Sequence, residues 1–297
     1  MGPMSAFLSR PKLGSLTQGT LFTCASAEDY QGCKVYGIVI TARCDIAQSK
    51  APLYNYLPVV SFDDWIHRDG RLIFCDRLLK ATTGKMRACL KDAGYSSSLL
   101  STEEPTKILN VTFGVTTEKE AIKRPAQQFY RLVVEHSQIC ACISSEPNSC
   151  EMVPLADEFR KDRDAFLKEL TENRLNGFYF LPSVTTGEAN PGYVVLMRQV
   201  RHLGREIAHR VATGFSRDEY SVEVASIGGR SDPLSFDSED FAMPVGALQS
   251  PNIEHLMQAF SSLFSRIGLP DVDSKYLDGL WGQQPSVGRI RNEVPSV

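Results

Sequence analysis

The sequence has no uninterrupted apolar run of about 18 residues, so no segment is long enough to cross a membrane as a helix. It also has no apolar stretch near its start of the kind that directs secretion, and we therefore expect a cytoplasmic protein. Positive charge is not in excess: 32 Lys and Arg stand against 35 Asp and Glu, for a formal net charge of −3. Any binding of nucleic acid must therefore depend on a local basic patch rather than on a global field.

Short motifs of common enzymes are missing as well. The chain contains no GxxxxGK[ST] phosphate loop, no GxGxxG, no HExxH, no GxSxG and no EF-hand loop. These absences argue against a common nucleotide-driven enzyme. They leave open an enzyme whose catalytic groups are dispersed along the chain.

Eight cysteines are scattered along the first half of the chain, and without a secretory signal we expect reduced thiols. The closest group is Cys140, Cys142 and Cys150. Its spacing matches no standard zinc motif and no fourth ligand is evident. We therefore predict small buried hydrophobic side chains here, and we predict neither a metal site nor a cofactor.

The pattern of apolar residues predicts strands and helices in irregular alternation. A length of 297 residues with 42% hydrophobic residues is enough for a large core. Runs of β-branched and aromatic residues predict strands at 19–25, 34–41, 56–62, 107–115, 177–184, 193–200 and 219–227. Apolar residues at helical spacing predict helices at 71–93, 118–135, 155–172, 201–212 and 250–268. Two prolines modify this prediction: Pro58 indicates an edge strand or a strand that starts after the proline, and Pro125 indicates an interrupted helix.

This irregular order predicts an α+β fold rather than a doubly wound parallel sheet. We expect a bent sheet or small SH3-like β-barrel at the N-terminus, with helices inserted irregularly. We divide the chain into a β-rich region at 1–95, an α+β region at 96–280 and a tail at 281–297. The amphipathic helix at 250–268 is expected to pack back on the N-terminal strands, because its apolar face is too broad to stay exposed.

Two clusters of polar residues are candidates for catalysis. Arg43, Cys44 and Asp45 follow directly on a strand, where a rigid scaffold presents side chains to solvent. Here Cys44 is a candidate nucleophile and Asp45 a candidate base, while the plain alternative is a turn in which Cys44 packs inward. Glu254 and His255 lie at the start of the last helix, where Glu254 also complements the helix dipole. If the two clusters meet in one cleft, an enzyme is favoured.

A third cluster is basic. Arg198, Arg201, His202 and Arg205 fall within one short segment. On a helix, the arginines would share a face that can bind the phosphates of nucleic acid. The alternative is a solvated helix face with ordinary ion pairs.

The N-terminal segment resembles toxins of the PemK/MazF type, which have an SH3-like barrel. The resemblance lies in Gly19-Thr-Leu-Phe22, Gly37-Ile-Val-Ile-Thr41 and Leu57-Pro-Val-Val60, which follow one another in the family's order within the first 62 residues. The strand end Thr-x-x-Cys-Asp-Ile and the late Ser-Pro-x-x-Glu-His-Leu segment are also similar to uncharacterised bacterial proteins of defence gene clusters.

Together these features favour a bacterial recognition protein without enzymatic activity. It would bind nucleic acid or a partner protein in a phage-defence or toxin–antitoxin system. The alternative is a ribonuclease-like nuclease in which Asp45 or His255 activates a nucleophile and arginines stabilise the charge on the phosphate.

Overall fold

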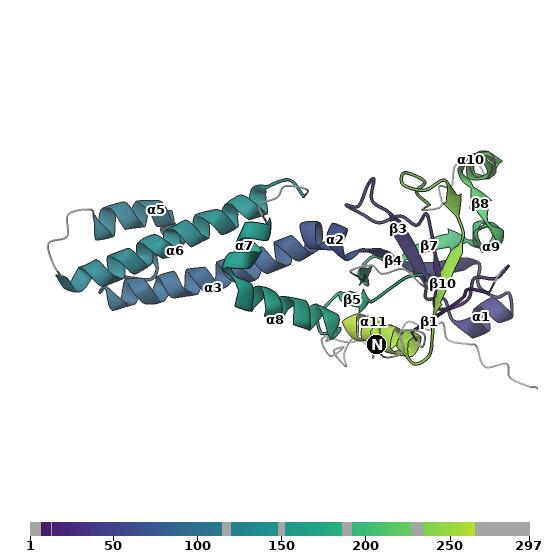
Figure 1. Ribbon diagram of the computed structural model, residues 1–297, viewed down its shortest axis with the longest axis horizontal. Helices are drawn as coiled ribbons and strands as arrows, with labels where there is room; N and C mark the ends of the chain where they lie inside the picture. The colour runs from purple at the N-terminus through teal and green to yellow at the C-terminus, as the bar shows by residue number, and fades with distance from the viewer. Residues whose placement is uncertain are drawn as a thin grey trace, which may run out of the picture.

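The structure is a computed structural model that describes residues 7–12, 14–114, 120–147, 152–185, 192–226 and 234–264. The chain forms a curled antiparallel sheet, a half-barrel, from which a long helical arm projects (Figure 1). The predicted α+β class with a bent sheet is therefore confirmed. Within the described residues, no helix is long and apolar enough to span a membrane.

The half-barrel is built from strands that lie far apart in the sequence. Its eight described strands are β1 (Leu8–Ser9), β2 (Thr20–Phe22), β3 (Val35–Val39), β4 (Leu53–Ser61), β5 (Phe178–Leu181), β6 (Tyr193–Leu196), β7 (Arg201–Gly204) and β10 (Pro244–Leu248). Their order is β1-β10-β2-β3-β4-β6-β5, with β7 paired to β4, and every pair is antiparallel. The sheet thus takes strands from both sides of residue 95. A separate pair joins β8 (Phe215–Ser216) to β9 (Phe241–Ala242).

The central strand β3 is buried on both faces. Val35 and Val39 belong to one core cluster, and Tyr36 and Ile38 belong to another. A strand covered on both faces needs apolar side chains at every position. This explains why β3, with the sequence VYGIV, has no polar side chain, and why this strand was easy to predict.

The prediction that Pro58 marks an edge strand was wrong. β4 pairs with β3 along one side, and along the other side it pairs first with β7 and then with β6. Pro58 lies between the stretch paired to β7, which ends at Tyr56, and the stretch paired to β6, which starts at Val59. At this junction the missing N–H of proline removes no bond of the ladder.

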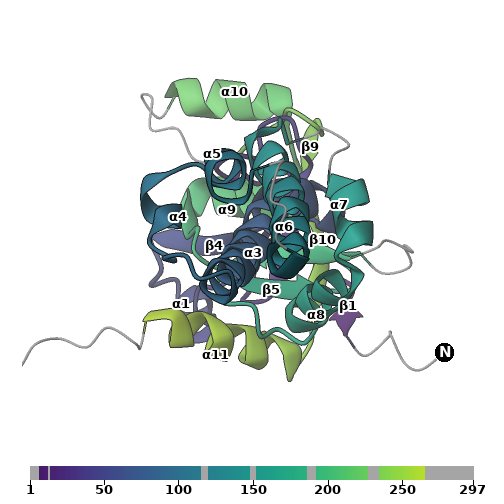
Figure 2. The same ribbon diagram turned by 90° about the vertical axis from the view of Figure 1, so that its left-hand side faces the viewer.

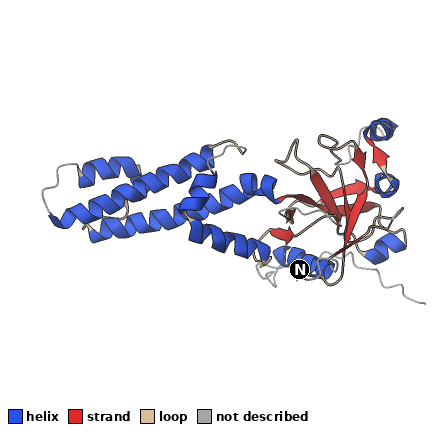
Figure 3. Cartoon of the chain, in the orientation of Figure 1, coloured by secondary structure: helices blue, strands red, loops and turns tan. Residues whose placement is uncertain are grey.

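The helical arm leaves the sheet at the end of β4 and returns to it at β5 (Figures 1 and 3). Its described helices are α2 (Phe62–Trp65), η2 (Ile66–Gly70), α3 (Arg71–Asp92), α4 (Leu99–Thr102), α5 (Pro105–Ile108), η3 (Leu109–Phe113), α6 (Glu120–Ser144), α7 (Met152–Glu158) and α8 (Arg160–Thr171). The two long helices α3 and α6 lie side by side, as the end-on view also shows (Figure 2). With 22 residues, α3 alone is about 33 Å long.

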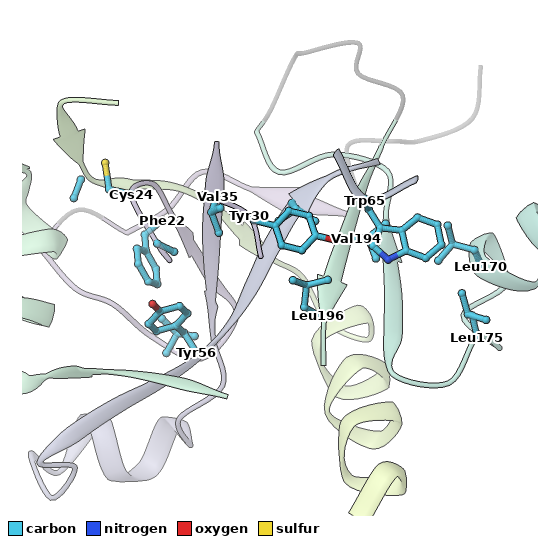
Figure 4. Close-up of a cluster of buried hydrophobic side chains, with 14 of the residues drawn as sticks. Phe22, Cys24, Tyr30, Val35, Tyr56, Trp65, Leu170, Leu175, Val194 and Leu196 are labelled. Atoms are coloured by element: carbon cyan, nitrogen blue, oxygen red, sulfur yellow. The ribbon is translucent and has the colours of Figure 1, made fainter. Parts of the chain in front are cut away.

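A continuous apolar core, which we call the neck cluster, joins the arm to the sheet. Trp65 is fully buried, stacks on Phe166 of α8 at 5.8 Å between ring centroids, and meets Phe178 of β5 edge-on at 5.3 Å. Val194 and Leu196 of the sheet lie in the same cluster (Figure 4). Because rings from the arm and the sheet share this core, the arm is packed on the half-barrel rather than merely tethered to it.

The far end of the arm has a small core of its own, the tip cluster. Its buried members are Met86, Cys89, Leu90, Ile108, Phe113, Phe129, Leu132 and Val133. Phe113 stacks on Phe129 at 5.0 Å, and Tyr95 donates a hydrogen bond to the carbonyl of Thr112 at 3.0 Å. The tip thus has a core of its own, separate from the neck cluster.

Three helices complete the described half-barrel, together with the single turn α1 (Arg43–Ala47). They are α9 (Arg205–Thr213), α10 (Arg217–Ser226) and α11 (Asn252–Phe264). Ile253 and Leu256 of α11 are buried with Leu8, Leu21 and Ile38 in what we call the α11 cluster. The last helix and the N-terminal strands therefore share one core. The predicted end of this helix at Gly268 lies outside the described residues.

Several predicted elements were wrong. The segment 107–115 was expected to be a strand, but it forms the end of α5 and then η3. The segment 219–227 was also expected to be a strand, and α10 lies there. In both, β-branched residues suggested a strand, but packing against neighbouring helices or exposure to solvent decided the conformation.

The boundaries of two helices also differ from the prediction. The helix expected at 155–172 is divided into α7 and α8, because Phe159 leaves the helical conformation with φ −98° and ψ 43°. The helix expected at 118–135 extends to Ser144 and runs through Pro125 without ending. Pro125 lies in the second turn of α6, where little of the helix precedes it.

Candidate functional site

The strand-end cluster lies on the surface of the half-barrel. The Oγ1 of Thr41 accepts a hydrogen bond from the N–H of Asn55 at 2.6 Å, which fixes the end of β3. The single turn α1 then presents Arg43, Cys44 and Asp45 to solvent. The thiol of Cys44 lies 3.6 Å from Oδ1 of Asp45. Cys44 is exposed, so the alternative in which it packs inward was wrong.

The start of α11 meets this cluster. Nη2 of Arg43 lies 3.8 Å from Oε1 of Glu254, and both side chains are more than half exposed. An ion pair so open to water contributes roughly 0–1 kcal/mol, and so it places the two segments side by side without holding them firmly.

His255 faces a different neighbour. Its Nδ1 lies 2.9 Å from the hydroxyl of Tyr179 on β5. Burial raises the pKa of Tyr179 to about 12, so the phenol keeps its proton and can donate it in this hydrogen bond. Within the described residues, no hydrogen bond or ion pair joins His255 to Cys44 or Asp45. The structure therefore brings Arg43 and Glu254 together and places Cys44 against Asp45, but it does not bring His255 to either of them.

The basic segment does not form one helical face, and that part of the prediction was wrong. Arg201 and His202 lie on strand β7, where neighbouring side chains point to opposite faces, and only Arg205 begins a helix.

The arginines of this segment have different local roles. Arg205 donates hydrogen bonds to the backbone carbonyls of Ser49 and Ala51 at 2.8–2.9 Å, so it fastens α9 to the loop before β4. Arg201 lies 3.8 Å from Glu28. Arg198 is exposed and lies against Gly177, where any side chain would collide with it. These arginines therefore make separate local contacts and do not form the single helical face that was predicted.

The cysteine group lies along α6 at the neck. Cys142 is buried near Cys75 of α3, and burial and this neighbour raise the pKa of Cys75 to about 12. Cys140 is half-buried, and its sulfur lies 3.7 Å from Nδ1 of His136. Cys150 lies outside the described residues. In the part of the chain that the structure describes, no three His, Cys, Asp or Glu side chains gather in a way that could hold a metal ion.

A further site, which the sequence did not indicate, lies at the tip of the arm. Here η3 and the first turns of α6 enclose an open cavity of about 700 Å³, which we call the tip groove. Its walls are mainly apolar and are lined by Leu109, Asn110, Phe113, Gly114, Ala126, Gln127, Tyr130 and Arg131. The volume lies in the range of sites that bind ligands or anchor side chains.

Exposed apolar side chains lie on the two elements that form the tip groove. Tyr130 of α6 lines the groove and is 58% exposed. Val111 of η3 is 78% exposed, and Val134, one helical turn after Tyr130, is also exposed. Large exposed apolar side chains beside an apolar groove are typical of a binding site.

The tip groove continues into a polar cavity of about 420 Å³ between α3 and α6, and the two share Gln127 and Arg131. This second part is lined by Lys85, Arg124 and Arg131, and also by Glu135. Among the side chains that the structure describes, Lys85 and Arg131 have no acidic partner within the distance of an ion pair.

We compared the chain with models of protein families, with curated proteins and with solved structures, and none of them matches.

Proposed function

We propose that this chain is a cytoplasmic recognition protein that binds a partner protein through the tip of its helical arm. The tip groove carries this proposal. It combines a cavity of about 700 Å³ with exposed Tyr130 and Val111, on an arm that projects far from the half-barrel. Buried aromatic anchors in apolar pockets supply much of the affinity between proteins, and this groove has the size and lining to receive one.

A partner protein is favoured over nucleic acid by the mainly apolar lining of the tip groove, and the arginines at 198–205 that were predicted to bind phosphate make local contacts instead. A phosphate backbone is bound by cations that lie together on one face. Here Arg205 is held by backbone carbonyls, and Arg201 lies beside Glu28. The resemblance of the first strands to PemK/MazF-type toxins supports a setting in bacterial toxin–antitoxin control or phage defence.

The test compares two exposed glutamines on helices. Gln127 lines both parts of the tip groove, and Gln258 lies on α11 of the half-barrel. Gln127→Trp should fill the groove, whereas Gln258→Trp should leave it open. Tagged full-length proteins would be purified from the native host, and the bound material identified by mass spectrometry and by nucleic-acid staining.

We expect one or more proteins to co-purify with the wild type and with Gln258→Trp, and to be lost from Gln127→Trp. Partners that remain bound to Gln127→Trp would refute a role for the groove. Co-purified nucleic acid in place of protein would favour the other class of ligand.

A second candidate is a nuclease, favoured by the contact between Arg43 and Glu254. In this mechanism Asp45 or His255 activates the nucleophile, and Cys44 is the candidate nucleophile within the protein. Arg43 stabilises the charge on the phosphate. The test is turnover of RNA and DNA by Asp45→Ala and His255→Ala. For a nuclease, each variant should lose activity by orders of magnitude and retain its melting temperature. Wild-type protein without turnover would exclude this candidate.

A further inference from the structure

We infer that the segment bound in the tip groove is an acidic amphipathic helix of the partner protein, with an apolar or aromatic anchor followed by carboxylates. This inference rests on the proposed function and adds the chemistry of the partner. It is based on the continuity of the apolar part of the groove, at Leu109, Phe113, Ala126 and Tyr130, with the cationic part at Lys85, Arg124 and Arg131.

The apolar part of the groove determines which side chain of the bound segment acts as its anchor. Phe113 and Ala126 pack against the tip cluster, so this wall is supported from behind. Tyr130 stands at the open side and is largely exposed. An aromatic or branched apolar side chain that enters the cavity would be enclosed by these walls and by the ring of Tyr130, and it would remove their apolar surface from water.

The cationic part of the groove determines the charge of the bound segment. Arg124 and Arg131 are seven residues apart on α6, which places them two turns apart on the same face of the helix. Lys85 reaches the same cavity from α3. With Glu135 as the one carboxylate in the lining, three positive charges and one negative charge leave a net charge of +2. Complementary charge beside an apolar pocket fixes the register of a bound segment and excludes basic competitors.

The geometry favours a helix as the bound form. The two parts lie beside one another over the same turns of α6, because residues 126–131 line the apolar part and residues 124–135 line the polar part. From Arg124 to Arg131 the rise along α6 is about 10 Å. A bound helix covers that distance in about two turns, so an anchor and acidic residues on neighbouring faces of it would reach the two parts together. This is the helix-in-groove mode of recognition.

The experiment selects binders from a random library of displayed peptides of about 16 residues, a length of four helical turns. The full chain is the target, and a charge-reversed variant provides the counter-selection. That variant is Arg124→Glu with Arg131→Glu. The matched control is Arg160→Glu with Lys161→Glu, two exposed positions on α8.

We expect the enriched peptides to join an aromatic or branched apolar residue to two or more Asp or Glu within two helical turns. The best peptide should bind the charge-reversed variant at least about tenfold more weakly and bind the control variant as it binds the wild type. Its affinity should also fall as salt rises from about 50 mM to about 500 mM, because these cations are exposed.

Two results would overturn the inference, and they are distinguishable. Enriched peptides that lose binding to Gln127→Trp, but are not acidic and ignore the charge reversal, would refute the acidic segment and leave the proposed function standing. If no enriched peptide depends on Gln127, both the inference and the proposed function fail. Equal melting temperatures of all variants would exclude unfolding as the cause of lost binding.

Discussion

Arg71 is a buried cation that fastens the two long helices at the base of the arm, and its loss should loosen that junction. It is 5% exposed. Its Nη1 donates hydrogen bonds to the carbonyls of Cys142 and Ser145 at 2.5 and 2.6 Å, and its Nε donates one to the carbonyl of His67 at 3.1 Å. The carbonyls of Cys142 and Ser145 end α6, where no further turn of the helix can satisfy them.

The substitution Arg71→Met keeps much of the length and removes every donor. In this variant Ser145 Oγ still donates a hydrogen bond to the carbonyl of Cys142 at 2.8 Å. The carbonyls of Ser145 and His67 therefore lose more of their hydrogen bonding than that of Cys142 does. A hydrogen bond from a charged donor contributes about 1.5–3 kcal/mol, and the bonds of one guanidinium are not additive. We therefore expect a loss of about 3 kcal/mol in the free energy of unfolding. This corresponds to a fall of roughly 6–12 °C in the melting temperature.

The same helix offers a matched control in Arg77. Its guanidinium forms two hydrogen bonds with Glu169 at 2.6 and 3.1 Å, but its side chain is 43% exposed. Arg77→Met should therefore cost at most about 1 kcal/mol. Calorimetry measures both variants, and hydrogen exchange of the amides at 139–145 reports the end of α6. A melting temperature of Arg71→Met within about 2 °C of that of Arg77→Met would refute this account of the junction.

Three further predictions concern the half-barrel. Leu256→Ala should destabilise the protein by about 2–5 kcal/mol in urea titration, because Leu256 is fully buried in the α11 cluster, whereas Gln258→Ala on the exposed face should have little effect. Arg205→Met should lower the free energy of unfolding by about 1–3 kcal/mol through its lost backbone hydrogen bonds, and Arg198→Met by less than about 0.5 kcal/mol; equal losses would show that Arg205 does not fasten α9. Because folding raises the pKa of Tyr179 from 10.0 to about 12, the folded state holds this proton more tightly, and stability present below pH 10 should fall as the pH rises to about 12. Melting temperatures across this range should fall less steeply for Tyr179→Phe, and an unchanged slope would contradict the assignment.

The sequence predicted the elements whose apolar residues form a clear pattern, either a short continuous run for a buried strand or helical spacing for an amphipathic helix. Strand β3 is covered on both faces, and its lack of polar side chains, together with its several β-branched residues, indicated this burial. Helix α11 buries Ile253 and Leu256 at i, i+3 spacing, which a helical pattern detects. Helix α3 was placed within one residue of its observed bounds, 71–92.

The sequence did not predict elements that depend on tertiary partners. The segment 201–204 was predicted as the start of a helix at 201–212, but it pairs with β4 as strand β7, and Leu203 is buried there. Strand β10 was not predicted at all, although it joins β1 to β2 in the sheet. Its small residues Gly246 and Ala247 carry little propensity for a strand, and the pairing alone determines its conformation.

The candidate sites likewise divide into residues that the local sequence pattern indicated and residues that only tertiary packing brings together. The sequence placed Arg43 near a strand end and Glu254 at a helix start, and the structure brings these two side chains together. The tip groove was missed because one wall comes from η3, which was predicted as a strand; the other wall, at 126–131, lies within the helix that was predicted at 118–135. Exposed Tyr130 and Val134, one turn apart on that helix, were the available signal.

The central claim is that the tip of the arm binds a partner protein, and photo-crosslinking from two matched positions tests it most directly. Val111 on η3 is 78% exposed and Val222 on α10 of the half-barrel is 72% exposed, so a photoreactive amino acid is equally accessible at either position. After irradiation in the native host, we predict a discrete protein adduct from position 111 and none from position 222. An adduct from position 222 alone, or an adduct to nucleic acid from position 111, would contradict the claim.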